Sequence, residues 1–255
     1  MKTILITGGT GKIGGQLTAH FLKKDWQVIT TTRKRSNLHK LVDRELIDAE
    51  QLRQITAIEV DFENPDAVQN IMAFFAEHPH LYPEVLVNNA RSLKTLKVET
   101  NGWSKPSNLL REYLIDVVVP YELSMHLSTV QDSPLKSIIN ISSIYGIVPF
   151  NPNLYTNYEA SAPIQYSLAK SAVIQLTKEL AIRLSKKQIK VNTVSYGGVQ
   201  GRQDTAFEAR YAQLCPQGSM LTEEQTIGPV DFLASSNSDG ITGQNLIQDG
   251  GWTCW

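Results

Sequence analysis

Apolar residues are distributed along the chain in short runs that alternate with longer stretches of helical spacing. Most of the runs are continuous and rich in Ile and Val, as expected of strands buried on both faces of a parallel sheet. Seven runs predict β-strands, at Thr3–Thr7, Gln27–Thr32, Ala57–Asp61, Val85–Asn88, Ser137–Ser142, Lys190–Ser195 and Asn245–Gln248.

Amphipathic stretches between these runs predict helices at Gly14–Lys24, Pro65–Glu77, Asn108–Ser128 and Ala162–Lys186. The alternation indicates βαβ units, and therefore an α/β fold with a doubly wound parallel sheet and helices on both faces. Since no change in composition marks a second domain, we expect a single domain over residues 1–255. The stretch 197–228 contains no predicted strand and is expected to form a loop with short helices above the carboxyl edge of the sheet, where such folds bind ligands.

A glycine-rich segment, "ILITGGTGKIGG", joins the first predicted strand to the first predicted helix. Gly9, Gly11 and Gly14 match the pattern G-x-G-x-x-G in the context that the pattern requires. Glycine allows the backbone to turn tightly and approach a pyrophosphate, and the helix N-terminus offers N–H groups to the anion. The segment predicts a dinucleotide site of the Rossmann type; a glycine-rich turn without a ligand is the alternative.

The end of the second predicted strand, "VITTTRKRS", indicates which dinucleotide binds. Thr32 stands where an NAD site carries an acid, and Arg33, Lys34 and Arg35 follow it. A carboxylate there would repel a 2′-phosphate, whereas a guanidinium can bind one with two hydrogen bonds. The sequence therefore favours NADP(H) over NAD(H), unless these cations only solvate the start of a helix.

Composition narrows the possible partners and compartment. The formal net charge of −1 indicates no surface for nucleic acid, and no apolar run is long enough to span a membrane. The N-terminal residues lack the features of a signal peptide, and neither the five histidines nor Cys215 and Cys254 follow a metal-binding spacing. We expect a cytoplasmic protein without a metal site.

Several motifs in order along essentially the whole chain resemble the short-chain dehydrogenase/reductase superfamily. They are TGGTGKIG, Asp61 in "VDF", "NNA" at 88–90, "NISS" at 140–143, Tyr166-x-x-x-Lys170, "KVNTVS" at 190–195 and "ITGQNLIQDGGW" near the end. The length and the last motif resemble the classical branch of the family. The glycine spacing Gly8, Gly11, Gly14 and the long segment before Tyr166 instead resemble the extended, sugar-nucleotide-modifying branch. Residues 137–255 are similar to bacterial oxidoreductases of flagellin-modification and nonulosonic-acid pathways.

The resemblance implies hydride transfer between a nicotinamide and a carbonyl or secondary alcohol. Tyr166 would exchange the proton, Lys170 would stabilise the phenolate and hold the nicotinamide ribose, and Ser143 would donate a hydrogen bond to the carbonyl oxygen. The implied cofactor residues are Gly8, Thr10, Gly11, Lys12, Ile13, Gly14, Arg33, Asp61, Phe62, Asn89, Ala90, Tyr166, Lys170, Gly197 and Val199. For some of these positions ordinary structural roles remain open, such as a turn cap for Ser143 or a turn for Asp61, and Asn88 is expected to tie neighbouring strands together.

Three positions depart from the family pattern. Asp116 aligns with the Asn of the family's catalytic tetrad, which puts the proton relay in doubt. Tyr196 precedes Gly197 where the family has Pro-Gly, and Arg91 replaces the glycine after "NNA". We expect the last two changes to reshape the nicotinamide and substrate pockets.

The leading hypothesis is an NADP(H)-dependent oxidoreductase that acts on a polar, sugar-like substrate. The insert at 149–163 is rich in Asn, Tyr and Ser, which hydrogen-bond and stack on sugars, although such residues also form plain surface loops. The alternatives are a regulator that senses NADP(H) without turnover and an epimerase or dehydratase of the extended type. We also expect a homodimer or homotetramer, with Trp252 and Trp255 in contacts between subunits.

Overall fold

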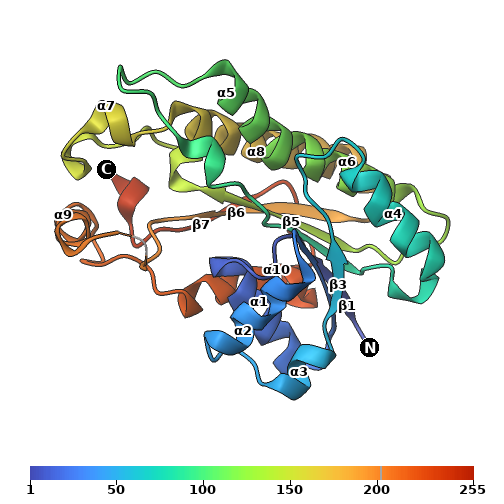
Figure 1. Ribbon diagram of the computed structural model, residues 1–255. Coiled ribbons are helices and arrows are strands. Elements are labelled where there is room, and N and C mark those ends of the chain that lie inside the picture. Colours follow the sequence, from blue (N-terminus) through green and yellow to red (C-terminus); the bar gives the residue numbers. More distant parts are fainter. Residues whose placement is uncertain (202) are drawn as a thin grey trace.

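The computed structural model describes residues 1–201 and 203–255; Arg202, inside the predicted 197–228 loop, lies outside the described residues (Figure 1). Within the described residues seven strands form one sheet in the order β3-β2-β1-β4-β5-β6-β7, and every pairing is parallel. The predicted α/β fold with a doubly wound sheet is confirmed. The strands are β1 (Thr3–Ile6), β2 (Gln27–Thr32), β3 (Thr56–Glu59), β4 (Val85–Asn88), β5 (Ser137–Ser143), β6 (Lys190–Tyr196) and β7 (Asn245–Gln248).

Helices cover both faces of the sheet (Figure 1). One face carries α1 (Lys12–Lys23), α2 (His39–Asp43), α3 (Ala49–Arg53) and α10 (Ile227–Ala234); the other carries α4 (Ala67–Glu77), α5 (Pro106–Tyr113), α6 (Val119–Thr129) and α8 (Ile164–Arg183). Each face has its own apolar core, with Leu17 and Phe21 of α1 in one and Phe75 of α4 and Leu180 of α8 in the other. The remaining helices, α7 (Tyr158–Ser161) and α9 (Thr205–Leu214), lie together near the C-terminus.

Polar side chains connect the central strands to α8. The Asn88 side-chain amide donates to Asn140 Oδ1 at 2.8 Å, and the Asn140 amide donates to Thr177 Oγ1 at 2.8 Å. Because the bonded groups are buried, they need these partners to avoid the cost of an unpaired polar atom. The predicted strand-tying role of Asn88 is confirmed, and the bonds fix β4, β5 and α8 relative to one another.

The helix predicted over Asn108–Ser128 is interrupted by a π-helical segment at Leu114–Val118, between α5 and α6. Proline lacks the N–H that would bond the carbonyl four residues earlier, and for Pro120 that residue is Asp116. The chain therefore widens its turn at this position, as π-helical insertions do, often beside functional sites.

The other differences from the predicted elements are small. Helix α8 begins at Ile164, because Pro163 precedes it with an extended backbone. The 197–228 segment contains the helix α9, in agreement with the expected short helices. It also contains an isolated β-bridge between Val199 and Leu221. No helix among the described residues is long and apolar enough to cross a lipid bilayer.

Candidate active site

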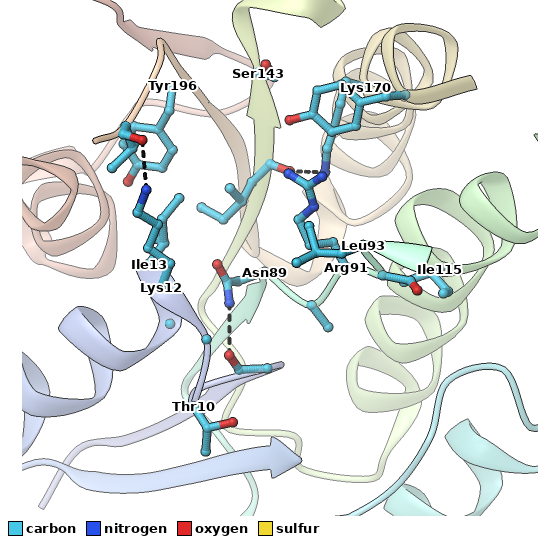
Figure 2. Close-up of a pocket in the computed structure, with 18 of the residues that line it drawn as sticks. Thr10, Lys12, Ile13, Asn89, Arg91, Leu93, Ile115, Ser143, Lys170 and Tyr196 are labelled. Carbon is cyan, nitrogen blue, oxygen red and sulfur yellow. Dashed lines mark hydrogen bonds between the residues drawn. The ribbon is translucent and has the colours of Figure 1, made fainter. Parts of the chain in front are cut away.

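A cavity of about 740 Å³ opens at the carboxyl ends of the strands (Figure 2). The glycine loop, the segments after β2, β3 and β4, the ends of β5 and β6, and helix α8 all contribute to its walls. Every site residue inferred from the sequence lines this cavity except Asp116, which lies behind Lys170. The strand order reverses between β1 and β4, which is the place where open α/β sheets bind ligands.

The glycine loop is shaped to let a ligand approach the backbone. Gly8 has a φ of +68°, a conformation that favours glycine. A Cβ added at Gly14 would lie 2.3 Å from Gly8 O and 2.7 Å from Asn89 Nδ2. The Asn89 side chain donates to Gly8 O at 3.3 Å, and Lys12 Nζ donates to Val199 O at 2.7 Å, so both flanking segments are fixed to the loop (Figure 2).

The far end of the cavity carries the cation expected for a 2′-phosphate. Arg33 is exposed and lines the cavity, whereas Lys34 and Arg35 do not line it. Thr32 is buried and accepts a hydrogen bond from Asn37 Nδ2 at 3.3 Å. Only Arg33 of the three consecutive cations is therefore placed to meet a nucleotide here.

Asp61 and Phe62 also line this end of the cavity. Asp61 forms a turn as well, because its Oδ1 accepts a hydrogen bond from Glu63 N at 3.1 Å. Arg44 was not anticipated from the sequence, where an isolated Arg in a polar stretch carries no signal. Its guanidinium donates to Gly11 O at 3.1 Å and pairs with Glu223, so it braces the glycine loop, and Arg44 itself also lines the cavity.

Ser143, Tyr166 and Lys170 come together at the other end of the cavity. Ser143 ends β5, and its Oγ accepts from Tyr145 N at 3.2 Å, so the serine caps a short turn as well as lining the cavity. Lys170 Nζ lies 5.7 Å from the centre of the Tyr166 ring and donates to Ile141 O at 3.1 Å. The spacing of four residues on α8 brings the lysine beside the tyrosine, as the sequence predicts.

Asp116 forms a buried ion pair with Lys170. Its Oδ2 lies 2.8 Å from Lys170 Nζ, and the side chains are only 1% and 6% exposed. The carboxylate oxygens accept no well-aligned hydrogen bond from the described residues, so the contact is chiefly electrostatic. The position at which the family resemblance implies an Asn thus holds a charge in direct contact with the lysine.

A second carboxylate lies near this pair. Glu112, one turn before Asp116, is buried and accepts a hydrogen bond from Thr95 Oγ1. Burial, together with the charge of Asp116, raises the pKa of Glu112 above its usual value, against the opposing effects of Thr95, Arg91 and Lys170. Sequence reasoning did not select Glu112, although its spacing of four residues from Asp116 was a signal that the two share a helix face.

Aromatic side chains form the wall beside the end of the cavity that holds Ser143, Tyr166 and Lys170. Tyr145 and Tyr155 join through their hydroxyls at 3.0 Å, and both line the cavity with Phe207 and Tyr211. Burial raises the pKa of Tyr155 to about 12, which keeps its hydroxyl neutral. From the predicted substrate-side loops, 149–163 supplies Tyr155, and 197–228 supplies Gly197, Gly198, Val199, Gln203, Phe207, Tyr211 and Met220.

Two further expectations can be compared with the structure. Trp252 was expected at a subunit contact but is buried and stacks on Tyr211, with ring centres 4.4 Å apart, because the chain after β7 folds back over α9. Tyr196, in place of the family's proline, is buried and donates through its hydroxyl to Thr226 O. Among the described residues, no group of three or more His, Cys, Asp or Glu side chains could hold a metal ion.

Comparison with known proteins identifies the family. A family model described as enoyl-(acyl carrier protein) reductase matches residues 10–253, and the chain therefore belongs to the short-chain dehydrogenase/reductase superfamily. These enzymes act on CH–OH and C=O groups with a nicotinamide cofactor.

Two relatives illustrate the range of similarity. Post-translational flagellin modification protein A of Campylobacter coli is 35% identical over 116 residues, which cover 46% of this chain and 45% of that protein. D-arabinitol 2-dehydrogenase (ribulose-forming) of Candida albicans is 24% identical over an alignment that covers 100% of this chain and 93% of that protein.

Solved structures share the whole fold. A short-chain dehydrogenase of Leptospira borgpetersenii with bound NAD+ has a TM-score of 0.85 and 27% identity, with 99% of this chain and 92% of that chain covered. The NADP-bound structure of ElxO has a TM-score of 0.83 and 26% identity, with 100% and 99% covered. These two neighbours thus bind a nicotinamide cofactor, one of them in the phosphorylated form and the other in the unphosphorylated form.

Proposed function

We propose that the chain is an NADP(H)-dependent oxidoreductase that transfers a hydride between the nicotinamide and a carbonyl or secondary alcohol of a polar, sugar-like substrate. The observation that carries the proposal is that one cavity joins the glycine loop to Ser143, Tyr166 and Lys170. A turn-capping serine and a helix-face pair of Tyr and Lys would have no reason to meet at the end of a dinucleotide cavity that lies opposite Arg33.

The chemistry divides among the residues as follows. The bound nicotinamide would supply or accept the hydride. Tyr166 gives the proton to the carbonyl oxygen in reduction and removes it from the alcohol in oxidation. Lys170, held by Ile141 O and Asp116, places a positive charge beside the phenol and favours the phenolate. Ser143 donates to the substrate oxygen where charge develops. Asp116 is a positioning residue, since it acts through Lys170.

The preference for NADP(H) rests on Arg33. This guanidinium lines the cavity directly after β2, and Thr32 before it offers no carboxylate that would repel a 2′-phosphate. The structural neighbours bind NAD+ in one case and NADP in another, so the preference comes from this chain's own residues.

A sugar-like substrate is supported from two directions. One relative is named for flagellin modification and another for the oxidation of a sugar alcohol. The cavity wall of Tyr145, Tyr155 and Phe207 offers rings and hydroxyls that can stack on and hydrogen-bond to a polyol. We propose that the substrate belongs to a surface-glycan or nonulosonic-acid pathway. The free state of Cys215 and Cys254 supports activity in the reducing cytoplasm.

The test is hydride transfer by a Tyr166→Phe variant, measured as single-turnover absorbance changes of NADPH with a panel of keto sugars. The substitution removes only the proton donor, so turnover should fall by about 100-fold or more while NADPH affinity stays nearly unchanged. Tyr158→Phe is the matched control, because Tyr158 is exposed and outside the cavity. Transfer at the unmodified rate in Tyr166→Phe would refute the proposed role.

A regulator that senses NADP(H) without turnover remains a second candidate, and one observation favours it. The carboxylate of Asp116 offsets part of the charge that Lys170 would direct to Tyr166. Such a regulator would bind NADPH with the same affinity but would show no hydride transfer with any carbonyl compound, even before Tyr166 is changed.

A further inference from the structure

Arg91 is a charged residue of the cavity to which the proposed function gives no role. It follows Asn89 and Ala90 at the end of β4, in the position where the family pattern has glycine, and its exposed side chain lines the cavity. The guanidinium carbon lies 4.7 Å from the centre of the Tyr166 ring. In Figure 2, Arg91 lies on the side of the cavity that carries Lys170, across from Lys12.

No carboxylate of the described residues forms an ion pair with Arg91. Asp116 is committed to Lys170 at 2.8 Å, and Glu112 is buried and bonded to Thr95. Burial raises the pKa of Glu112 more than the charge of Arg91 lowers it, and no ion pair forms between the two side chains. The catalytic end of the cavity therefore presents a guanidinium with donor groups available to a ligand.

The phosphates of the cofactor have other places to bind. The glycine loop and the N-terminus of α1 would hold the pyrophosphate, and Arg33 lines the end beyond it. The reacting carbonyl must come within hydrogen-bond reach of the Tyr166 hydroxyl. A group a few bonds away from that carbonyl can then reach a guanidinium that lies over the same ring.

We propose that Arg91 is a specificity-determining residue that binds an anionic group, a carboxylate or a phosphate ester, on the sugar-like substrate. This inference rests on the proposed function, because it assumes that the substrate carbonyl is bound at Tyr166. A guanidinium binds either anion with two parallel hydrogen bonds, which adds orientation to affinity. The family's glycine could make no such contact. The aromatic wall then receives the sugar ring while Arg91 fixes its charged end.

Three ketones that share the same C2 carbonyl test the inference: D-fructose, its 6-phosphate, and 2-keto-D-gluconate, which has a carboxylate next to the ketone. Their binding to the NADP+-saturated protein is measured by titration calorimetry, a readout that needs no turnover. At least one of the two anionic ketones should bind about tenfold or more tightly than D-fructose, the size of one charge-assisted contact. The anion that is preferred distinguishes a sugar acid from a sugar phosphate.

Variants assign the preference to Arg91. Arg91→Gly should abolish the difference between the anionic ketones and D-fructose, and Arg91→Lys should keep part of it because the charge remains. Lys97→Ala is the control, since Lys97 is an exposed cation of the same loop that does not line the cavity. Equal binding of the three ketones, no measurable binding of either anionic ketone at millimolar concentration, or a preference that survives in Arg91→Gly would each overturn the inference.

Further outcomes distinguish substrate binding by Arg91 from cofactor binding by Arg91. They also separate failure of this inference from failure of the proposed function. If Arg91→Gly weakens NADP+ and leaves the anion preference intact, Arg91 serves the cofactor and the inference is wrong. If the keto sugars react with NADPH but show no anion preference, the inference fails and the proposed function stands. If the anionic ketones bind more tightly than D-fructose but no hydride transfer occurs, the anion site at Arg91 stands and the proposed function fails.

Discussion

The proposed preference for NADP(H) is assigned to the guanidinium of Arg33, because Lys34 and Arg35, the cations next to it in the sequence, do not line the cavity. NADPH should therefore bind more tightly than NADH by roughly 1.5–3 kcal/mol, the size of a charge-assisted contact. Arg33→Ala should remove most of this difference, and Lys34→Ala should leave it unchanged. Fluorescence titrations of both cofactors give the dissociation constants. Equal constants for the unmodified protein would contradict the assignment.

Glu112 gives the stability of the protein a pH dependence with a defined sign. Its pKa is raised above the usual 4.5 in the folded state, chiefly by burial. A carboxyl with a raised pKa favours folding below its unfolded pKa, and this contribution is lost as the pH rises through the folded value.

A Glu112→Gln variant removes the ionisation and keeps an oxygen for Thr95 Oγ1. Its stability relative to the unmodified protein should therefore rise as the pH increases above the usual pKa of a glutamate. Urea unfolding at several pH values measures this difference. A constant or falling difference would show that Glu112 stays ionised throughout the range.

At the scale of elements, the π-helical segment Leu114–Val118 connects the fold to the chemistry. Pro120 denies the Asp116 carbonyl its helical partner, and the widened turn carries Asp116 beside Lys170 of α8. The segment and α8 also pack directly against each other. The position of Lys170, and with it the proton transfer proposed for Tyr166, thus depends on an irregular helix from another part of the chain.

The Asp116→Asn variant should separate two effects of Asp116, the positioning of Lys170 and the negative charge that it places beside Lys170. The amide can still accept a hydrogen bond from Lys170, but the lysine loses its buried counterion, so the free energy of unfolding should fall by about 1–3 kcal/mol. The unopposed charge of Lys170 should favour the phenolate of Tyr166, which moves the acid limb of the pH–rate profile for alcohol oxidation to lower pH. Asp132→Asn, on the exposed surface, is the control.

Steady-state rates across pH give the profile, with any alcohol that the unmodified enzyme oxidises. An unchanged acid limb in Asp116→Asn would mean that the charge of Asp116 does not reach Tyr166. Asp116 would then be a structural partner of Lys170 without influence on proton transfer.

The local sequence pattern determines the helices and strands to a greater extent than it determines the contacts within the candidate site. Buried strands such as Val85–Asn88 and the glycine loop were predictable, since strand burial and phosphate-loop geometry depend on neighbouring residues in the sequence. The family resemblance aligned Asp116 with a tetrad position, but its direct ion pair with Lys170 and the placement of Arg91 over Tyr166 could not be read from local pattern, because they arise from contacts between distant segments. The short helix α3 also went unpredicted, although its Asp48 and Gln51 form a capping box.

At the scale of the whole molecule, helix α8 has two different faces. Tyr166 and Lys170 face the cavity, while Ile164 and Leu168 are 55% and 53% exposed. Leu110 on α5, which packs beside α8, is 73% exposed. Side chains of this kind on adjacent helices form an apolar surface that a monomer would leave in water. The helix to which we assign the proton transfer therefore also carries exposed apolar side chains.

We predict a symmetric homodimer or homotetramer in which α5 and α8 contact the same helices of a second copy. In a two-fold interface each residue is buried twice, so Leu168→Asp removes two buried leucines and should raise the dissociation constant roughly 100-fold. Light scattering at micromolar concentration measures the mass. Lys23→Asp, a charge reversal on α1 across the sheet, should leave the assembly intact. A monomer mass for the unmodified protein would show that Ile164, Leu168 and Leu110 remain exposed in solution and that α8 holds its catalytic face without a partner subunit.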